Sequence, residues 1–197
     1  MRWPARARSA MCTAVLVCWG SVAVSAQESV HASKISTFHG VLAQVLQAPD
    51  FTARVRILAP SVPEVFDLRR IAQVSVGRVW RDLDDEAQLE FEKLLTELIV
   101  STYASRFAGD RGQSFATLAE EVGPRGTVVR TALTTADGDQ VRLDYYLRDG
   151  KVFNVVADGV SDLALRRADY RSVIKSAGFD GLLSHLRAQV VELKEEN

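Results

Sequence analysis

Apolar and polar residues alternate strictly between residues 141 and 148. This period of two predicts a half-buried β-strand with one apolar face. The next two residues, Asp149 and Gly150, favour the positive backbone φ angles of a tight hairpin turn. The following segment, residues 151–158, is apolar on both faces. A strand of that kind needs apolar cover on both sides, supplied by packed helices or by something that is not protein.

Upstream, apolar residues recur three or four positions apart, which predicts helices. The first is expected over residues 34–47, after a loose polar stretch that ends at Ser33, and the second over residues 51–58. Pro60 and Pro63 then bracket a predicted turn, because proline interrupts helical hydrogen bonding. A third helix is expected from about residue 65 to Gly77 or beyond.

The longest predicted helix begins after Asp84, whose carboxylate is suited to cap a helix N-terminus, and continues to Phe107 with a wide apolar stripe. Two further helices are expected at the end of the chain. One spans residues 163–177 and is closed by Gly178, and the other spans residues 180–193.

Between these helical regions the period changes to two. Strands are predicted over residues 115–122 and 127–135, separated by the turn at residues 123–126. Together with the hairpin described above they make four sequential strands joined by short turns, which is typical of an antiparallel meander. The order helices, sheet, helices predicts an α+β fold, with one strongly twisted, mainly antiparallel four-stranded sheet wrapped by about five or six helices.

The N-terminus has the features of an export signal. Three arginines fall within the first eight residues, residues 10–24 form an apolar core, and the small residues 24–26 suit a cleavage site. We expect residues 1–26 to be cleaved and residues 27–197 to form a single domain. An uncleaved anchor is the rival interpretation. Lipoprotein processing is not expected, because Cys18 follows Val17 where a small residue is required.

Cleavage would remove three arginines, no acids and both cysteines. The remaining 171 residues would carry 21 basic and 25 acidic groups, a formal charge of −4. A chain without thiols has no disulfides, no thiolate metal site and no cysteine nucleophile. Its mild acidity argues against nucleic acid as a partner.

No catalytic or metal-binding motif is recognisable. His31, His39 and His185 stand in no metal-ligand spacing, and no GxSxG elbow is present. No metal or cofactor is therefore expected. Asp144 lies among apolar neighbours, and we expect it to face outward with Arg142 and Arg148 and to pair across the sheet.

Several blocks of sequence carry a family resemblance. They are VRLDYYL at residues 141–147, DGVS at 158–161, RRADYRSVI at 166–174, GFDGLL at 178–183, and a glycine and tryptophan spaced as Gly77 and Trp80. In this order they resemble the MlaC, or toluene-tolerance, family of periplasmic phospholipid-binding proteins, over about residues 34 to 190. The tight turn at residues 149–150, and Phe153 where a tryptophan is common, are similar to the hopanoid-associated HpnM branch.

The resemblance implies a periplasmic lipid carrier with an apolar pocket between sheet and helices, holding phospholipid or hopanoid. It also implies docking to an inner-membrane ABC transporter complex, with an outer-membrane partner as a further expectation, and the protein is expected to be a monomer. A lipid-processing enzyme and a non-enzymatic interaction module are the alternative hypotheses. The residues expected to line the pocket are Phe66, Ile71, Val74, Leu94, Leu98, Tyr103, Leu143, Tyr145, Val155 and Ala157.

Overall fold

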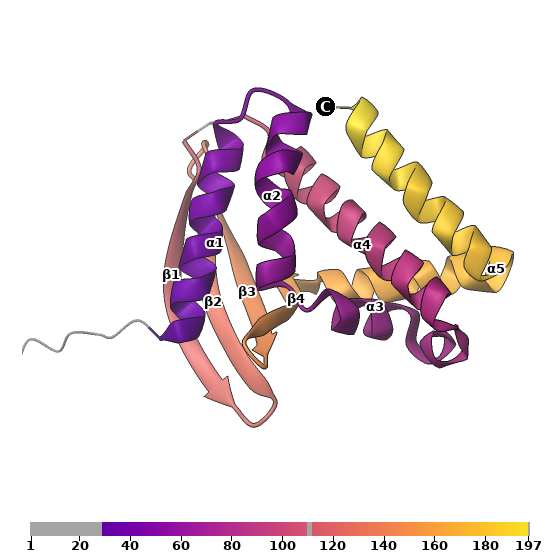
Figure 1. Cartoon of the computed structure of the whole chain (residues 1–197). Coiled ribbons are helices and arrows are strands. Elements are labelled where there is room, and N and C mark those ends of the chain that lie inside the picture. Colours follow the sequence, from indigo (N-terminus) through magenta and orange to yellow (C-terminus); the bar gives the residue numbers. More distant parts are fainter. Residues whose placement is uncertain (1–28, 110–111, 197) are drawn as a thin grey trace, which may run out of the picture.

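The computed structural model describes residues 29–109 and 112–196. The predicted signal peptide, residues 1–26, lies outside the described residues, so its cleavage stays a prediction. In the described ranges the chain forms five α-helices, one short 3₁₀ helix and five strands, which confirms the α+β class (Figure 1). In order these are α1 (Val30–Leu46), α2 (Phe51–Val65), α3 (Leu68–Val76), η1 (Gly77–Asp82), α4 (Asp85–Arg106), β1 (Ser114–Gly123), β2 (Gly126–Thr134), β3 (Gln140–Arg148), β4 (Lys151–Ala157), β5 (Val160–Ser161) and α5 (Asp162–Glu195).

The strands form one antiparallel sheet in the order β1-β2-β3-β4-β5, in which each strand pairs with the next along the chain. The expectation of four strands was wrong, because Val160 and Ser161 pair with the end of β4. Asp158 and Gly159 have φ angles of 47° and 85° and reverse the chain between these strands. Two residues are too few to show alternation, so the pattern could not reveal β5.

Helix α1 begins earlier than its apolar stripe. The hydroxyl of Ser29 accepts a hydrogen bond from the backbone N–H of Ala32 at 3.2 Å, which caps the helix. Ala32, in the first turn of the helix, is itself buried. The expectation of a loose segment up to Ser33 was therefore wrong for the residues that follow this cap.

Helix α2 continues through both prolines, so the predicted turn at Pro60 and Pro63 was wrong. Pro60 is exposed on the outer side of the helix, where water can satisfy the carbonyl that lost its N–H partner. Val62 and Val65 extend the buried face by one more turn. Burial of these two side chains offsets the cost of proline within the helix.

The longer helices follow their predicted boundaries. Asp84 caps α4, and its carboxylate accepts from the Ala87 N–H at 2.8 Å. The two predicted C-terminal helices are the two arms of α5, which turns at Gly178, where φ is 72°. Ser161 caps the first arm, and Asn154 of β4 accepts from both the Ser161 hydroxyl at 3.0 Å and the Leu163 N–H at 3.2 Å.

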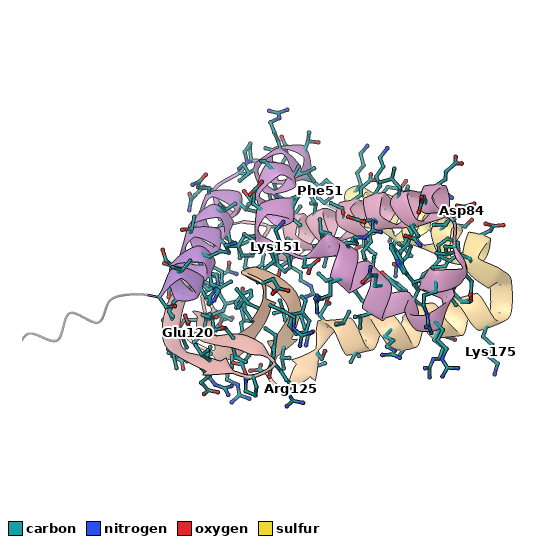
Figure 2. All side chains as sticks on the ribbon, turned by 60° about the horizontal axis from the view of Figure 1, so that its bottom comes forward. Phe51, Asp84, Glu120, Arg125, Lys151 and Lys175 are labelled. Carbon is teal, nitrogen blue, oxygen red and sulfur yellow. The ribbon has the colours of Figure 1, made fainter. Side chains whose placement is uncertain are left out.

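The helices cover the sheet unequally. Figure 1 shows α1 lying across β1 and β2, while α4 and α5 extend beyond the β4 side of the sheet. Helix α4 packs mainly against α2, α3 and α5, and α5 also contacts β4. Figure 2 shows the β1–β2 hairpin, marked by Glu120 and Arg125, at one end of the molecule and the helical end, marked by Asp84 and Lys175, at the other. The two parts meet along β4.

Candidate functional site

A cavity of about 370 Å³ lies where β3 and β4 face α4 and the start of α5. Its walls are mainly apolar. Those from the sheet are Leu133, Val141, Leu143, Tyr145, Phe153, Val155 and Ala157, and those from the helical side are Phe66, Ile71, Ile99, Tyr103, Phe107, Leu163 and Leu165. Side chains therefore do not fill the whole space between the sheet and the helices.

The strand register brings the sheet residues together. Leu143 stands opposite Ala157, and Tyr145 stands opposite Val155, so these side chains share the face that looks toward α4. Beyond this point Leu147 pairs with Val152, which leaves Phe153 as an extra residue in a bulge. The bulge puts Val152 on the same face as Val155 and Ala157, whereas Val156 is on the other face, opposite Asp144.

Seven of the ten residues predicted to line a pocket do line this cavity: Phe66, Ile71, Tyr103, Leu143, Tyr145, Val155 and Ala157. Val74, Leu94 and Leu98 are outside its lining. The face of α4 toward the cavity carries Ile99, Thr102, Tyr103 and Arg106, a spacing of three and four residues. Leu98 lies one turn before Thr102, on the side of α4 that lines a neighbouring groove. Contact of any of these residues with a lipid stays a prediction.

Aromatic rings crowd one end of the cavity. The Tyr103 ring lies 5.5 Å from Phe38, 5.8 Å from Phe66 and 6.0 Å from Phe107, measured between ring centroids. Phe107 in turn lies 5.9 Å from Phe115. Sequence reasoning missed Phe107, although it follows Tyr103 by one helical turn and continues the same stripe.

A buried hydrogen bond joins α1 to Tyr145 in the wall of the cavity. The Nε2 atom of His39 lies 3.0 Å from the hydroxyl of Tyr145, and the imidazole stacks on Phe115 at 4.3 Å. Burial lowers the pKa of His39 to about 4, and burial raises the pKa of Tyr145 well above its ordinary value. Both groups are therefore uncharged at neutral pH, and this wall of the cavity carries no charge.

The mouth of the cavity combines exposed apolar and charged side chains. Val160 and Leu165 are 53% and 59% exposed. Arg106 ends α4, and Arg166 in the first arm of α5 donates from Nε to the Asp162 carboxylate at 2.7 Å. Burial by itself lowers the pKa of Arg166, but Asp162 and Tyr170 outweigh it, so this pKa lies above its ordinary value. Three charged residues, Arg106, Asp162 and Arg166, thus line the cavity, and the Arg166 side chain is only 13% exposed.

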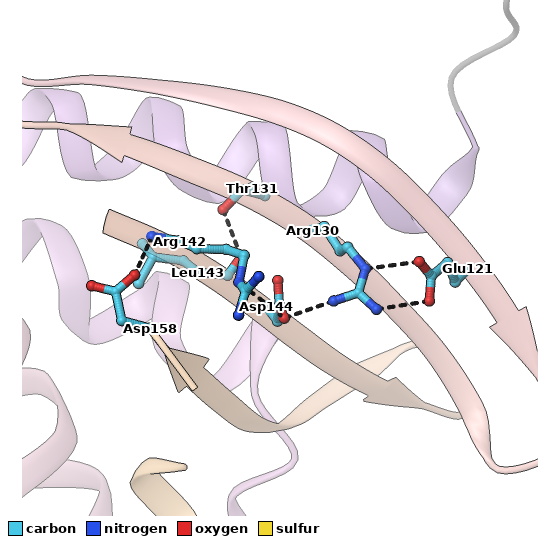
Figure 3. Close-up of polar contacts among 7 residues, drawn as sticks. All are labelled: Glu121, Arg130, Thr131, Arg142, Leu143, Asp144 and Asp158. Atoms are coloured by element: carbon cyan, nitrogen blue, oxygen red, sulfur yellow. Dashed lines mark hydrogen bonds and ion pairs between the residues drawn. The ribbon is translucent and has the colours of Figure 1, made fainter. Parts of the chain in front are cut away.

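Asp144 lies on the opposite face of the sheet (Figure 3). Its carboxylate accepts from Arg130 Nη1 at 2.8 Å, and Arg130 also pairs with Glu121. Arg142 approaches the same carboxylate at 3.8 Å, whereas Arg148 donates to the backbone of Arg125. The expected pairing across the sheet is therefore present, but Arg130 is the main partner and Arg148 is not one. Asp144 is on the outer face as expected, but its side chain is only 6% exposed because it is paired with arginine side chains.

The histidine near the end of the chain is paired. His185 lies 3.2 Å from Asp169, on the surface where the two arms of α5 face each other. Among the described residues no group of three or more His, Cys, Asp and Glu side chains could hold a metal ion. Within the same residues, no helix combines the length and the apolar character that a membrane span requires.

The protein is therefore of the class with an α+β fold and an apolar cavity between one antiparallel sheet and its helices. The model of the MlaC protein family matches residues 37–188, and the chain therefore belongs to the MlaC family. The family resemblance of the sequence blocks is thus confirmed.

A solved structure shares the fold. It is that of the phospholipid-binding protein from Ralstonia solanacearum in complex with a phospholipid, with a TM-score of 0.71 and 23% sequence identity. The superposition covers 82% of this chain and 97% of the Ralstonia chain. No curated protein sequence matches this chain.

Proposed function

We propose that this protein is a lipid carrier that holds apolar tails in the cavity between β3, β4, α4 and α5. The observation that carries the proposal is a cavity with mainly apolar walls that opens beside the exposed apolar residues Val160 and Leu165. Membership of the MlaC family and the phospholipid held by the Ralstonia protein support it. Acyl tails suit such a cavity, because water in contact with apolar walls is unfavourable in free energy.

The energetics favour a carrier that needs help to unload. Each buried methylene contributes about 0.8 kcal/mol, so one long acyl chain supplies roughly 10 kcal/mol before ordering costs. Release at that affinity is slow. We therefore propose that the exported protein works in the periplasm, moves lipid between membranes and unloads on an inner-membrane ABC transporter, with an outer-membrane partner at the other end.

A hopanoid is the second ligand class. The observation that favours it is Phe153, which lines the cavity at the position where a tryptophan is common in phospholipid carriers. A smaller ring leaves more width at that point, and a fused-ring skeleton is wide and rigid where an acyl chain is narrow. Phospholipid tails remain the first expectation, and identification of the bound lipid decides between the two.

Mass spectrometry of protein purified from a bacterial periplasm tests the proposal. We expect co-purified phospholipid, or hopanoid from a host that makes it. Ala157→Trp places an indole in the cavity and should lower the lipid content about tenfold. Ala116→Trp, on the exposed outer face of β1, is the matched control and should keep the lipid. Wild-type protein that is lipid-free and also refuses added lipid would remove the proposal.

A further inference from the structure

A second hollow adjoins the cavity. It has a volume of about 360 Å³ and lies between α4 and the two arms of α5. It shares five lining residues with the apolar cavity, namely Thr102, Arg106, Asp162, Leu165 and Arg166. We call this hollow the α4–α5 groove. Leu165, which lines both spaces, is exposed, so a molecule with its tails in the cavity can pass over this residue at the surface and place its polar end in the groove.

Charge changes sign along this path. Both arginines of the two spaces, Arg106 and Arg166, belong to the shared wall. The carboxylates that line only the groove are Asp169, Glu192 and Glu196, and no arginine or lysine is in that part of its lining. The shared wall also holds Asp162, which pairs with Arg166 at 2.7 Å. A path from the apolar cavity outward therefore meets a wall with two arginines and one carboxylate first, and carboxylates without arginines afterwards.

The outer carboxylates are available to a ligand. Asp169 is paired with His185 at 3.2 Å. Glu192 and Glu196 make no ion pair with any residue that the structure describes. In the same groove the side-chain oxygen of Gln189 is buried without a hydrogen-bond partner. An unsatisfied buried acceptor beside free carboxylates calls for a donor with positive charge.

We propose that the α4–α5 groove binds the headgroup of a zwitterionic phospholipid such as phosphatidylethanolamine. The inference rests on the proposed lipid-carrier function. In such a lipid the phosphate is next to the tails and the ammonium is farther out, which is the order of charge found here. Arg106 and Arg166 face the phosphate, and Glu192 and Glu196 face the ammonium, with Gln189 as a further acceptor. A lipid with only a negative headgroup gains from the arginines but is repelled by the outer carboxylates.

Competition between two lipids tests the inference. Purified, delipidated protein is incubated with vesicles that contain equal amounts of phosphatidylethanolamine and phosphatidylglycerol with identical acyl chains, and the bound lipids are quantified by mass spectrometry. We expect phosphatidylethanolamine to be enriched about threefold or more over its share in the vesicles, since two exposed charge contacts each contribute modestly.

Charge reversal supplies the matched comparison. Glu192→Lys with Glu196→Lys should abolish the enrichment or turn it toward phosphatidylglycerol, and lysine near a helix C-terminus is compatible with folding. The control, Glu97→Lys with Glu195→Lys, makes the same charge change at exposed positions outside the groove and should keep the wild-type ratio.

The outcomes separate the two proposals. Binding of both lipids in their vesicle ratio by the wild-type protein would overturn the headgroup site and leave the carrier function standing. The same holds if the control pair changes the ratio as much as the groove pair. Failure to bind either lipid would instead remove the carrier function, and the headgroup site with it.

Discussion

Acidification should destabilise this protein through one buried histidine. His39 is 6% exposed and is enclosed by the Phe115 ring and the Tyr145 hydroxyl. Neither neighbour carries charge between neutral pH and about pH 4. A proton added to the imidazole would therefore place an uncompensated charge in the wall behind the cavity.

The magnitude follows from the two pKa values of His39. In the unfolded chain the imidazole titrates near 6.5, whereas burial lowers its pKa in the folded protein to about 4. Between these values the unfolded state binds more protons, so the free energy of unfolding falls as the pH falls. The His39 contribution is fully present above 6.5 and is lost progressively toward 4. The loss amounts to about 2.5 kcal/mol between about pH 7.5 and about pH 4.5.

Urea unfolding at a series of pH values measures this effect. Carboxylates such as Glu121, whose pKa is lowered by its hydrogen bond with Arg130, also make stability depend on pH. Their contribution is removed by comparison with His39→Gln, which cannot titrate but can still hydrogen-bond to Tyr145. We expect the variant to lose about 2.5 kcal/mol less than the wild type over the same pH range.

A second substitution controls for the removal of any histidine. His185→Gln changes an imidazole on the α5 surface and should leave the pH dependence close to that of the wild type. If His39→Gln and the wild type show parallel curves from pH 7.5 to 4.5, the imidazole is not the buried neutral group described above, and the reasoning fails.

Three further substitutions test the packing of the fold, each by chemical denaturation. Arg130→Met should cost about 3 kcal/mol, because it leaves the buried Asp144 carboxylate without its main partner. Pro60→Ala should stabilise α2 by about 1 kcal/mol, because it restores a helical hydrogen bond on an exposed face. Gly126→Ala should cost at least about 2 kcal/mol, because its Cβ atom would lie 2.2 Å from the Leu147 carbonyl oxygen at a φ of 127°.

Each of these changes has a control. Arg142→Met removes a longer, 57% exposed contact to the same carboxylate and should cost less than about 1 kcal/mol. Pro49→Ala lies outside α2 and should change stability by less than about 0.5 kcal/mol. Gly138→Ala has a positive φ but open space around its Cβ position, so it should cost about 1 kcal/mol. If a control changes the free energy of unfolding as much as the substitution with which it is paired, the corresponding explanation is wrong.

Local signals predicted the elements well where they were strong. The caps at Asp84 and Gly178 and the turn at Asp149 and Gly150 are set by single residues, and the structure has each in the predicted place. The turn predicted at the prolines of α2 was wrong because burial of the final helical turn outweighs the free-energy cost of proline within the helix. The partner of Asp144 could not be predicted either, because it depends on strand register, which places Arg130 directly opposite.

The lining of the cavity was predictable only in part. A residue that faces a hollow and a residue packed in a core are both apolar and both avoid water, so their sequence patterns are the same. The strand residues Leu143, Tyr145, Val155 and Ala157 were found because alternation fixes which face they occupy. Leu94 and Leu98 are spaced by four residues from Thr102 and Arg106, so helical phase alone could not show that they lie outside the lining of the cavity.

The position of α4 explains why the hollow persists. This helix packs mainly on α2, α3 and α5 rather than on the sheet. The buried Arg54 of α2 donates from Nε to the Ala104 carbonyl of α4 at 2.7 Å, which fixes the C-terminal part of α4 from outside the cavity. Collapse of α4 onto β3 and β4 would break these contacts, including the hydrogen bond from the buried Arg54 guanidinium. A cavity held open by contacts outside its own walls can lose its occupant without losing its shape, as the proposed loading and unloading of a lipid requires.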